Sequence, residues 1–322
     1  KVTLLLTTTG QVAGAVSPDV AKSNAVGVAT VDGTKATIEL LDGILTLEGQ
    51  TTYSGAAAAK LNGCLVTVSS YKRDYLTLSK VNGKGASTAL NLTTNRMGTK
   101  ELSAGARFFE QVGNGRLVEI DRSDITITSI PANKITYVGY DWAGRVDKLV
   151  LNDVTGDRYD YGIIHYQPAG YQETPGNPNG NGEYKNGEIS VTNGSFPKGM
   201  TPYVVGSVDG AKTNRMGGVA GSLDQLDGQN RMAAFMPLNE AKGIRRAQFD
   251  TDAMLLTTNS MVIPISDAVE CYNKTTGDWF KPGEDGDHKA ALNLALAFSD
   301  DITVYYDRSP EEGGKVRIVV VE

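Results

Sequence analysis

The chain has few of the residues that carry out most enzymatic chemistry. Its 322 residues include only two cysteines, two histidines and two tryptophans. The sequence contains no His-Glu-x-x-His motif and no paired cysteines, so a zinc site is not expected. It also lacks a Walker loop, a dinucleotide fingerprint and a Gly-x-Ser-x-Gly elbow. A Ser/His/Asp triad would need His165 or His288, and neither lies in a recognisable motif. The sequence therefore predicts a protein that is not an enzyme and holds no cofactor.

Long apolar runs and an excess of basic residues are also missing. No apolar run approaches the ~20 residues that span a membrane as a helix, so no membrane span is expected. The net charge of −6 and the isoelectric point near 5.2 argue against a nucleic-acid partner, which requires a basic surface. We find no signal peptide, and the chain begins within a strand pattern. We interpret it as a piece of a longer protein, with a naturally processed terminus as the alternative.

The sequence is instead rich in residues that form turns and strands. Short runs of valine, threonine and leucine are separated by Asn-Gly and Asp-Gly pairs. These pairs suit tight hairpin turns because both residues accept positive φ angles. In the first half, only residues 56–61 (AAAAKL) have helical character. The composition predicts an all-β fold of tandem, duplicated small β-barrel or sandwich units, with hairpin-closing strands and very little helix.

One hairpin pattern occurs three times. Each copy has an apolar run rich in strand formers, a turn with glycine, and a second apolar run. The copies are residues 301–322 (DITVYYDRSPEEGGKVRIVVVE), 134–153 (KITYVGYDWAGRVDKLVLND) and 1–16 (KVTLLLTTTGQVAGAV). A hairpin that recurs in this way indicates a β-rich array. We expect residues 1–16 to be a hairpin equivalent to the end of a preceding unit, or a strand paired into the first barrel, because their apolar side chains would otherwise lie at an open edge.

Matching segments recur in the same order along the chain. Residues 26–28 (VGV) match residues 161–163 (YGI) at a shift of 135, and residues 92–97 (LTTNRM) match residues 256–261 (LTTNSM) at a shift of 164. The larger second shift requires a net insertion of 29 residues between these points. We place this insertion in the Pro-, Gly- and Asn-rich segment 167–199.

The matches divide the chain into a first unit at residues 17–155 and a second unit at residues 156–322 that carries the inserted loop. The first unit is either one structure or two small barrels, at residues 24–82 and 88–153. Residues 92–97 should superpose on residues 256–261, and residues 134–153 on residues 301–321.

Two further segments are expected to be strands. Residues 123–130 alternate between polar and apolar side chains, which is typical of a sheet with one solvated face. Residues 287–298 have some helical character, and Asp287 would suit a helix cap. The repeat places them opposite residues 124–131, however, so we assign them mostly to a strand.

The repeated hairpins and residues 153–162 (DVTGDRYDYG) resemble the β-rich portions of large surface-layer-type (S-layer) proteins of Gram-positive Clostridia. The likeness covers most of the chain, and residues 153–162 are its most distinctive piece. Such proteins commonly also carry helical S-layer homology repeats for anchoring, which this chain lacks. The resemblance implies an extracellular location at the bacterial cell surface. It also implies that other parts of the protein bind a cell-wall polymer or other surface proteins. It assigns no functional residue.

The best candidate ligand-binding residues are Tyr166, Tyr171 and Tyr184, in and beside the inserted loop. Tyrosine combines a flat apolar face with a polar tip, which suits a glycan or a protein ligand. The alternative is that these tyrosines pair across strands and cover a sheet. We expect the loop to project from the second barrel, because long surface insertions cost little closure entropy. Residues 183–191 should form an added hairpin around Asn186-Gly187.

Other polar groups give weaker signals. Glu119 and Asp121 share a strand face, which would suit a glycosidase carboxylate pair or simply a solvated sheet surface. Residues 224–230 and 285–287 contain oxygen ligands suited to calcium, but neither has regular calcium-loop spacing, so we assign no metal ligand. Cys64 and Cys271 are expected to be unpaired and inert in core strands.

Three functions are consistent with this sequence. We expect a non-catalytic structural or spacer region of a bacterial cell-surface protein. One alternative is a module that binds a glycan or a cell-wall polymer through the tyrosine-bearing loop. The other is an accessory domain of a glycoside hydrolase. Two similar β units would favour the first function, an exposed shelf of tyrosines the second, and a cleft with two close carboxylates the third.

Overall fold

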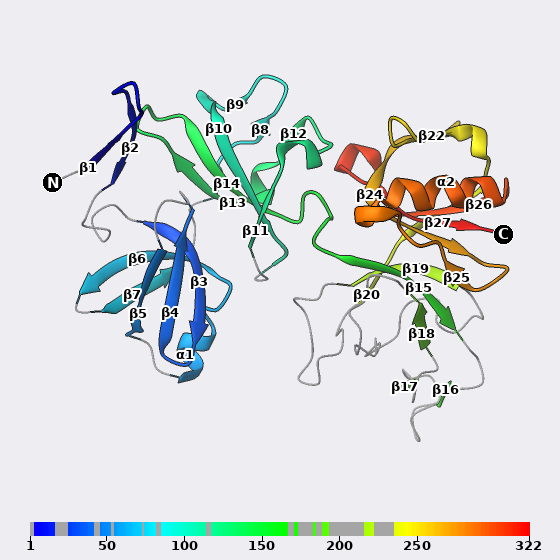
Figure 1. The fold of residues 1–322 in the computed structure, drawn as a ribbon, viewed down its shortest axis with the longest axis horizontal. Coiled ribbons are helices and arrows are strands. Elements are labelled where there is room, and N and C mark those ends of the chain that lie inside the picture. The colour runs from blue at the N-terminus through cyan, green and yellow to red at the C-terminus, as the bar shows by residue number, and fades with distance from the viewer. Residues whose placement is uncertain are drawn as a thin grey trace. The chain divides into compact units, whose positions relative to one another are not determined.

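The computed structural model shows a mostly β protein, as the sequence predicts, that divides into two compact units (Figure 1). The first unit comprises Lys1–Arg122 and Thr128–Asp153, and the second comprises Ser123–Ile127 and Val154–Glu322. The structure describes residues 3–322 except for residues 17–24, 42–45, 53–54, 73, 82–84, 114–116, 167–170, 173–182, 185–188, 193–215 and 222–234.

The first unit begins with an antiparallel hairpin. Strands β1 (Thr3–Leu6) and β2 (Val12–Val16) pair with each other in a two-stranded sheet. The turn between them places Gly10 at φ +80°, a conformation that glycine adopts without strain. The prediction of a hairpin at residues 1–16 is confirmed.

Five strands of the first unit close into a small barrel in the order β3-β4-β5-β7-β6. Their bounds are β3 (Val26–Asp32), β4 (Lys35–Leu40), β5 (Thr46–Thr51), β6 (Leu65–Lys72) and β7 (Tyr75–Lys80). Alternate side chains fill the interior, as Ala36, Ile38 and Leu40 of β4 do, because successive residues of a strand point to opposite faces. The predicted short helix is confirmed as α1 (Gly55–Ala59).

A seven-stranded sheet completes the first unit. Its order is β12-β8-β9-β10-β14-β13, with β11 paired to β10, and the β10–β14 pair is parallel. The strands are β8 (Leu90–Asn91), β9 (Arg96–Met97), β10 (Lys100–Gln111), β11 (Val118–Ile120), β12 (Ser129–Ile130), β13 (Ile135–Tyr140) and β14 (Val146–Asn152). Barrel residues Leu41 and Leu65 share a buried cluster with Phe109, Leu117 and Val150 of the sheet region.

The predicted strand at residues 123–130 is wrong for most of its length. The chain forms a 3-10 turn at η1 (Arg122–Asp124), and only Ser129–Ile130 joins a ladder; a second 3-10 turn, η2 (Ala132–Lys134), follows. Ser123–Ile127 belongs to the second unit, where Ile125 is buried without strand pairing. An alternating pattern identifies which side chains are buried but does not supply a neighbouring strand.

The second unit contains another seven-stranded sheet, ordered β21-β26-β27-β24-β23-β22 with β25 paired to β24. The strands are β21 (Asn239–Ile244), β22 (Phe249–Asp250), β23 (Leu255–Thr257), β24 (Val262–Asn273), β25 (Asp278–Trp279), β26 (Ile302–Tyr306) and β27 (Val316–Val321). Three 3-10 turns connect parts of it, at η4 (Arg246–Gln248), η5 (Glu284–Gly286) and η6 (Pro310–Glu312).

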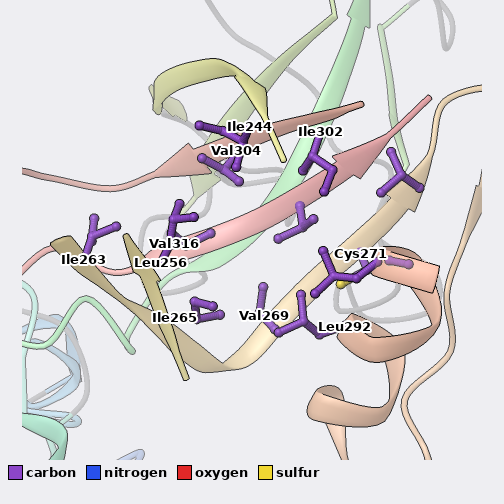
Figure 2. Packing of buried hydrophobic residues seen from close by; sticks show 14 residues of the cluster. Ile244, Leu256, Ile263, Ile265, Val269, Cys271, Leu292, Ile302, Val304 and Val316 are labelled. Carbon is purple, nitrogen blue, oxygen red and sulfur yellow. The ribbon is translucent and has the colours of Figure 1, made fainter. Parts of the chain in front are cut away.

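One face of this sheet is covered by the helix α2 (His288–Phe298), so the assignment of residues 287–298 to a strand is wrong. Asp287 caps the helix by accepting hydrogen bonds from the backbone N–H groups of Lys289 (2.9 Å) and Ala290 (3.3 Å). The buried side chains, Ala291, Leu292, Ala295 and Leu296, recur at helical spacing. Figure 2 shows Leu292 packed with residues of the sheet. The local helical pattern therefore prevails over the repeat.

The opposite face packs against a four-stranded sheet ordered β18-β15-β19-β20. Its strands are β15 (Asp160–Tyr166), β18 (Ile189–Thr192), β19 (Met216–Gly221) and β20 (Phe235–Pro237). Contact is close, because a Cβ atom at Gly218 would lie only 2.5 Å from the ring of Tyr305. Tyr161 and Ile163 of β15 share one core with Tyr272 and Val320 of the larger sheet. The second unit is thus layered as helix, sheet and sheet.

The hairpin predicted at residues 183–191 does not form. Strand β17 (Glu183–Tyr184) pairs with β16 (Tyr171–Gln172), and β18 pairs with β15. Strand β18 pairs with β15 and not with β17, because β15 offers it four register partners along an existing strand. The remainder of the segment 167–199, and with it the prediction that this loop projects from the unit, lies outside the described residues.

The two seven-stranded sheets repeat one topology. The order β8-β9-β10-β14-β13 with β11 on β10 corresponds to β22-β23-β24-β27-β26 with β25 on β24. Both long strands, β10 and β24, have 12 residues and pair in parallel with the final strand of their sheet. Each carries its register shift at the same place, between Leu102 and Arg107 in β10 and between Ile265 and Glu270 in β24.

Strand register confirms one of the two predicted superpositions. Residues 134–153 and 301–321 form equivalent hairpins, in which Ile135 pairs with Leu151 and Ile302 with Val321. The match of residues 92–97 to residues 256–261 is wrong. Residues 92–95 form a turn that precedes β9, whereas residues 258–261 form a turn that follows β23. The two similar sequences belong to turns at opposite ends of equivalent strands.

Candidate functional site

Two basic residues of the β26–β27 hairpin are buried in the second unit. Arg317 is 2% exposed and Lys315 is 7% exposed, although such residues are almost never fully buried without partners. Val316 and Ile318 pair with both adjacent strands, whereas Arg317 lies between them without a register partner in either ladder. An irregularity of this kind redirects a side chain. Here it directs the Arg317 guanidinium toward residues 154–159, which begin the main part of the second unit. We call residues 154–159 the entry segment.

All three nitrogens of the Arg317 guanidinium are hydrogen-bonded. Nε donates to Oδ2 of Asp307 (2.9 Å), and Nη1 donates to Oδ1 of Asp157 (2.5 Å) and to Oγ of Ser266 (3.0 Å). Nη2 donates to the carbonyl oxygen of Thr155 (2.6 Å) and lies 2.8 Å from Oδ2 of Asp307. A buried charge is tolerated only with such complete pairing, because desolvation of an unpaired ion is very costly.

Lys315 extends this network through Asp157. Its Nζ donates to Oδ2 of Asp157 (2.9 Å), so that one carboxylate bridges both cations. Burial favours the neutral acid, but the charges of Arg317 and then Lys315 outweigh it and lower the pKa of Asp157. Asp307 is fixed by its own hairpin, because its Oδ1 accepts the backbone N–H groups of Arg308 (2.9 Å) and Lys315 (2.8 Å).

The entry segment fits closely around these groups. Gly156 has φ +76°, and a Cβ atom there would overlap Nη2 of Arg317 and Oδ2 of Asp307. The hydroxyl of Tyr161 donates to the carbonyl oxygen of Gly156 (2.6 Å), and the Arg317 guanidinium lies 4.8 Å from the centroid of the Tyr161 ring. Burial raises the pKa of Tyr161 well above its ordinary value, so its hydroxyl remains a donor. We call the following set the clasp: Thr155, Gly156, Asp157, Tyr161, Ser266, Asp307, Lys315 and Arg317.

The clasp is chemically self-contained. Its two cations, Arg317 and Lys315, are matched by two carboxylates, Asp157 and Asp307. The adjoining cavity, which Tyr159 and Asp267 also line, has a volume of about 120 Å³. That is enough for a few water molecules but below the ~300 Å³ at which ligand pockets begin. The arrangement therefore holds a chain segment in place.

A larger cleft lies in the first unit, between barrel strands and the seven-stranded sheet. Arg107 donates from Nε to Oε1 of Glu119 (2.6 Å), from Nη2 to Oε2 of Glu119 (2.7 Å) and from Nη1 to the carbonyl oxygen of Leu41. The hydrogen bond from Arg107 lowers the pKa of Glu119. The cleft has a volume of about 320 Å³ and is also lined by Glu39, Phe109 and other side chains. Its lining combines buried apolar side chains with charged ones, and most of its exposed surface is polar.

The three predicted tyrosines lie on β15, β16 and β17. Tyr166 is the last residue of β15, and Tyr171 and Tyr184 are direct register partners across β16 and β17. The backbone thus brings two of the three together. Their side chains lie outside the described residues, so ligand binding by these tyrosines stays a prediction.

The structure places the other predicted groups in structural positions. Glu119 forms an ion pair with Arg107, not with a second carboxylate. Cys64 and Cys271 are free thiols, and burial raises the pKa of Cys271. Asp287 is a helix cap, whereas residues 224–230 lie outside the described residues.

Two searches of the described residues gave negative results. Among them, no group of three or more His, Cys, Asp and Glu side chains could hold a metal ion. No helix of the described part of the chain is long and apolar enough to cross a membrane.

Sequence reasoning missed the clasp. The available signals were a single arginine inside the apolar run VRIVVV and the aspartate in residues 153–162, the segment already noted as distinctive. The chain was also compared with family models, curated proteins and solved structures, and no match was found in any of the three.

Proposed function

We propose that the chain is a non-catalytic structural or spacer region of a bacterial cell-surface protein of the S-layer type, located outside the cell. Its two units repeat one sheet topology, and tandem repeats of this kind build length by stacking similar modules. The richest cluster of buried charged groups among the described residues is saturated by its own counter-charges. Both observations favour a mechanical role over catalysis.

The position of the clasp is the observation that carries this proposal. Thr155 and Asp157 lie at the start of Val154–Glu322, the main part of the second unit, and Arg317 lies on β27, the last strand of that part. Tension applied across this part of the chain would pass through these residues. Because the clasp joins the first segment of this part to its last strand, its bonds must break before the unit can extend. A spacer that resists extension needs such a connection.

Single-molecule stretching of the full chain tests this role. The Asp157→Asn variant keeps the shape of the side chain but removes the charge that bridges Lys315 and Arg317. It should lower the unfolding force of one of the two units and leave the other unchanged. Asp252→Asn is the matched control, because the Asp252–Lys289 pair lies on the surface, where ion pairs contribute little. Equal forces for wild type and Asp157→Asn would contradict the mechanical role. Antibody labelling of intact source cells would test the surface location separately.

One observation also favours a second candidate function, glycan binding through the tyrosine-bearing loop. Register brings Tyr171 opposite Tyr184, so two of the three predicted residues are neighbours in a two-stranded sheet. Sedimentation of the chain with insoluble cell-wall polysaccharide tests this function. Binding that disappears in a Tyr171→Ala/Tyr184→Ala variant would establish it, and retention of the wild-type chain in the supernatant would exclude it.

A further inference from the structure

A tryptophan stands at the tip of the β13–β14 hairpin in the first unit. Trp142 is 96% exposed. The turn that carries it is closed without the indole: Oδ1 of Asp141 accepts the backbone N–H groups of Ala143 (2.9 Å) and Arg145 (2.8 Å), and the backbone N–H of Asp141 donates to the carbonyl oxygen of Arg145 (2.9 Å). The residue that follows the first position of such a turn can be of almost any type. The fold therefore does not explain a tryptophan here.

The repeat supplies a direct comparison for this position. Asp141 and Asp307 each begin the turn of their hairpin, so Trp142 corresponds to Arg308 in the second unit. Nη1 of Arg308 donates to the carbonyl oxygen of Val154 (3.1 Å) and so contacts the entry segment. The same position thus makes a contact in one copy and points into solvent in the other.

The surroundings of Trp142 are aromatic and cationic. Tyr140, two residues earlier, is 52% exposed, and Nζ of Lys100 lies 5.8 Å from the centroid of its ring. We call Trp142, Tyr140 and Lys100 the knob. Two aromatic side chains cover far less than the ~800 Å² per partner of a standard flat protein interface. A knob of this size needs a concave surface to bind.

The cleft of the same unit has the matching chemistry. Its 320 Å³ volume is at the small end of the range for ligand pockets, and its lining is mostly polar, with a smaller apolar share from Val28, Leu41, Phe109 and Leu117. The Arg107 guanidinium, held by both oxygens of Glu119, lies 5.0 Å from the Phe109 ring centroid. A planar guanidinium stacks favourably on an indole. The carboxylates of Glu39 and Glu119, which also line the cleft, would accept the indole N–H and attract the ammonium group of Lys100.

We propose that the knob of one copy inserts into the cleft of a second copy. The two surfaces are different parts of the first unit, so the contact is head-to-tail and leaves a free knob at one end and a free cleft at the other. Contacts of this type generate open chains, because nothing closes them after two subunits. The contact is small and therefore weak for a single pair. This inference does not depend on the proposed spacer role.

Two variants separate the knob from the cleft. Trp142→Ala removes the knob, and Thr46→Tyr fills the cleft from an exposed position at its edge on β5. Sedimentation velocity from about 10 μM to about 1 mM should show wild-type association that rises with concentration. Each variant should associate at least ~30-fold more weakly, as expected for loss of a tryptophan anchor. Tyr75→Ala is the matched control, because Tyr75 is an exposed aromatic residue outside both surfaces and its loss should change nothing.

Mixing the two variants gives the decisive result. Trp142→Ala retains a cleft and Thr46→Tyr retains a knob, so an equimolar mixture should form dimers and no longer species. In a Trp279→Phe background, the fluorescence of Trp142 should shift to the blue as wild-type association proceeds. Monomeric behaviour of the folded wild-type chain at every concentration would overturn the proposal, as would a mixture that stays monomeric. A shift of Trp142 fluorescence that occurs only on addition of a polysaccharide or lipid vesicles would also overturn it.

Discussion

The two seven-stranded sheets share a topology but differ in what covers them. In the first unit, the sheet shares a buried cluster with the barrel, and β14 retains partly exposed positions. In the second unit, α2 packs against one face and the four-stranded sheet against the other, so all six residues of β27 are buried. A strand buried on both faces becomes a nearly continuous apolar run, which explains VRIVVV in β27 against VDKLVLN in β14.

The two sheets differ most clearly at the irregular position of their last strands, β14 and β27. Asp147 and Arg317 are equivalent, because each lies between residues that pair with both neighbouring strands. Asp147 forms an ion pair with its sequence neighbour Lys148 (2.6 Å), whereas Arg317 binds Asp157, 160 residues away. The scaffold thus supplies one redirected side chain per copy. The segment that meets this side chain decides whether it serves as a local contact or as a clasp.

Replacing Arg317 and, in the other copy, Asp147 should give the largest difference between the two units in the loss of free energy of unfolding. Arg317→Met leaves Asp307 without its cation and Asp157 with Lys315 alone, and it should destabilise the second unit by about 3–5 kcal/mol. Asp147→Asn affects a local pair and should cost the first unit less than about 1 kcal/mol. Urea unfolding followed by Trp279 fluorescence in a Trp142→Phe background reports the second unit. Hydrogen exchange of the backbone amides of β10 and β14 reports the first unit, because Trp142 is already exposed in the folded chain. Equal losses of stability in the two units would show that the clasp contributes no more than a local ion pair.

Filling the space beside Arg317 should lower the free energy of unfolding by a somewhat smaller amount. Gly156→Ala introduces a Cβ atom that overlaps Arg317 and Asp307, and it also strains a left-handed backbone, so a loss of about 3 kcal/mol is expected. Gly243→Ala is the control in the same unit, because Gly243 has φ +69° but open space around it. Backbone strain alone should cost about 1 kcal/mol there. Similar losses for the two variants would mean that the entry segment does not press against the arginine.

Acid should weaken the second unit more than the first. The folded-state pKa of Asp157 lies below its ordinary value of 3.8, so the group stabilises the fold above that pH and loses this contribution as the pH falls through the lowered value. Glu119 in the first unit shifts in the same direction, but its side chain is half-exposed and the effect is screened. Unfolding midpoints measured between about pH 5 and pH 2 should therefore diverge. Asp157→Asn should remove most of the divergence; a divergence that persists in this variant would assign it to other groups.

The smallest predicted effect concerns α2, which only the second sheet carries. Asp287→Ala removes the cap and should cost about 1 kcal/mol, whereas Asp287→Asn keeps an acceptor oxygen and should cost a few tenths. The exposed neighbour Glu284 provides the control, because Glu284→Ala removes a charge without removing a cap. A full loss with Asp287→Asn would show that charge, and not the hydrogen bonds, stabilises this end of the helix.

The sequence predicted local β structure well because that structure depends on near neighbours. The hairpins at residues 1–16, 134–153 and 301–321 follow from alternating strand formers on either side of a turn. The assignment of α2 failed for a different reason. Ala291, Leu292 and Ala295 have helical spacing, but the repeat places them opposite a segment with a strand pattern. A repeat fixes the order of the elements that both copies have, and α2 belongs to only one of the copies.

The clasp could not be predicted in the same way. An arginine in a strand normally indicates the solvated face, and although the run VRIVVV is typical of a strand buried on both faces, it does not identify the partners of Arg317. Its partners Thr155 and Asp157 are about 160 residues away. Only the layering of two sheets and a helix makes position 317 internal. Buried polar contacts between distant segments therefore require the fold, whereas turns and strands do not.

A double-mutant cycle between Asp157 and Arg317 tests the central claim that the clasp holds Thr155 and Asp157 against β27. Free energies of unfolding of the second unit would be measured for wild type, Asp157→Asn, Arg317→Met and the double variant, with Trp279 as the sole tryptophan. Residues that share direct hydrogen bonds couple by about 0.5–3 kcal/mol, and we predict a value in the upper half of that range. A coupling energy of less than about 0.3 kcal/mol, within the additivity expected of independent sites, would contradict the claim.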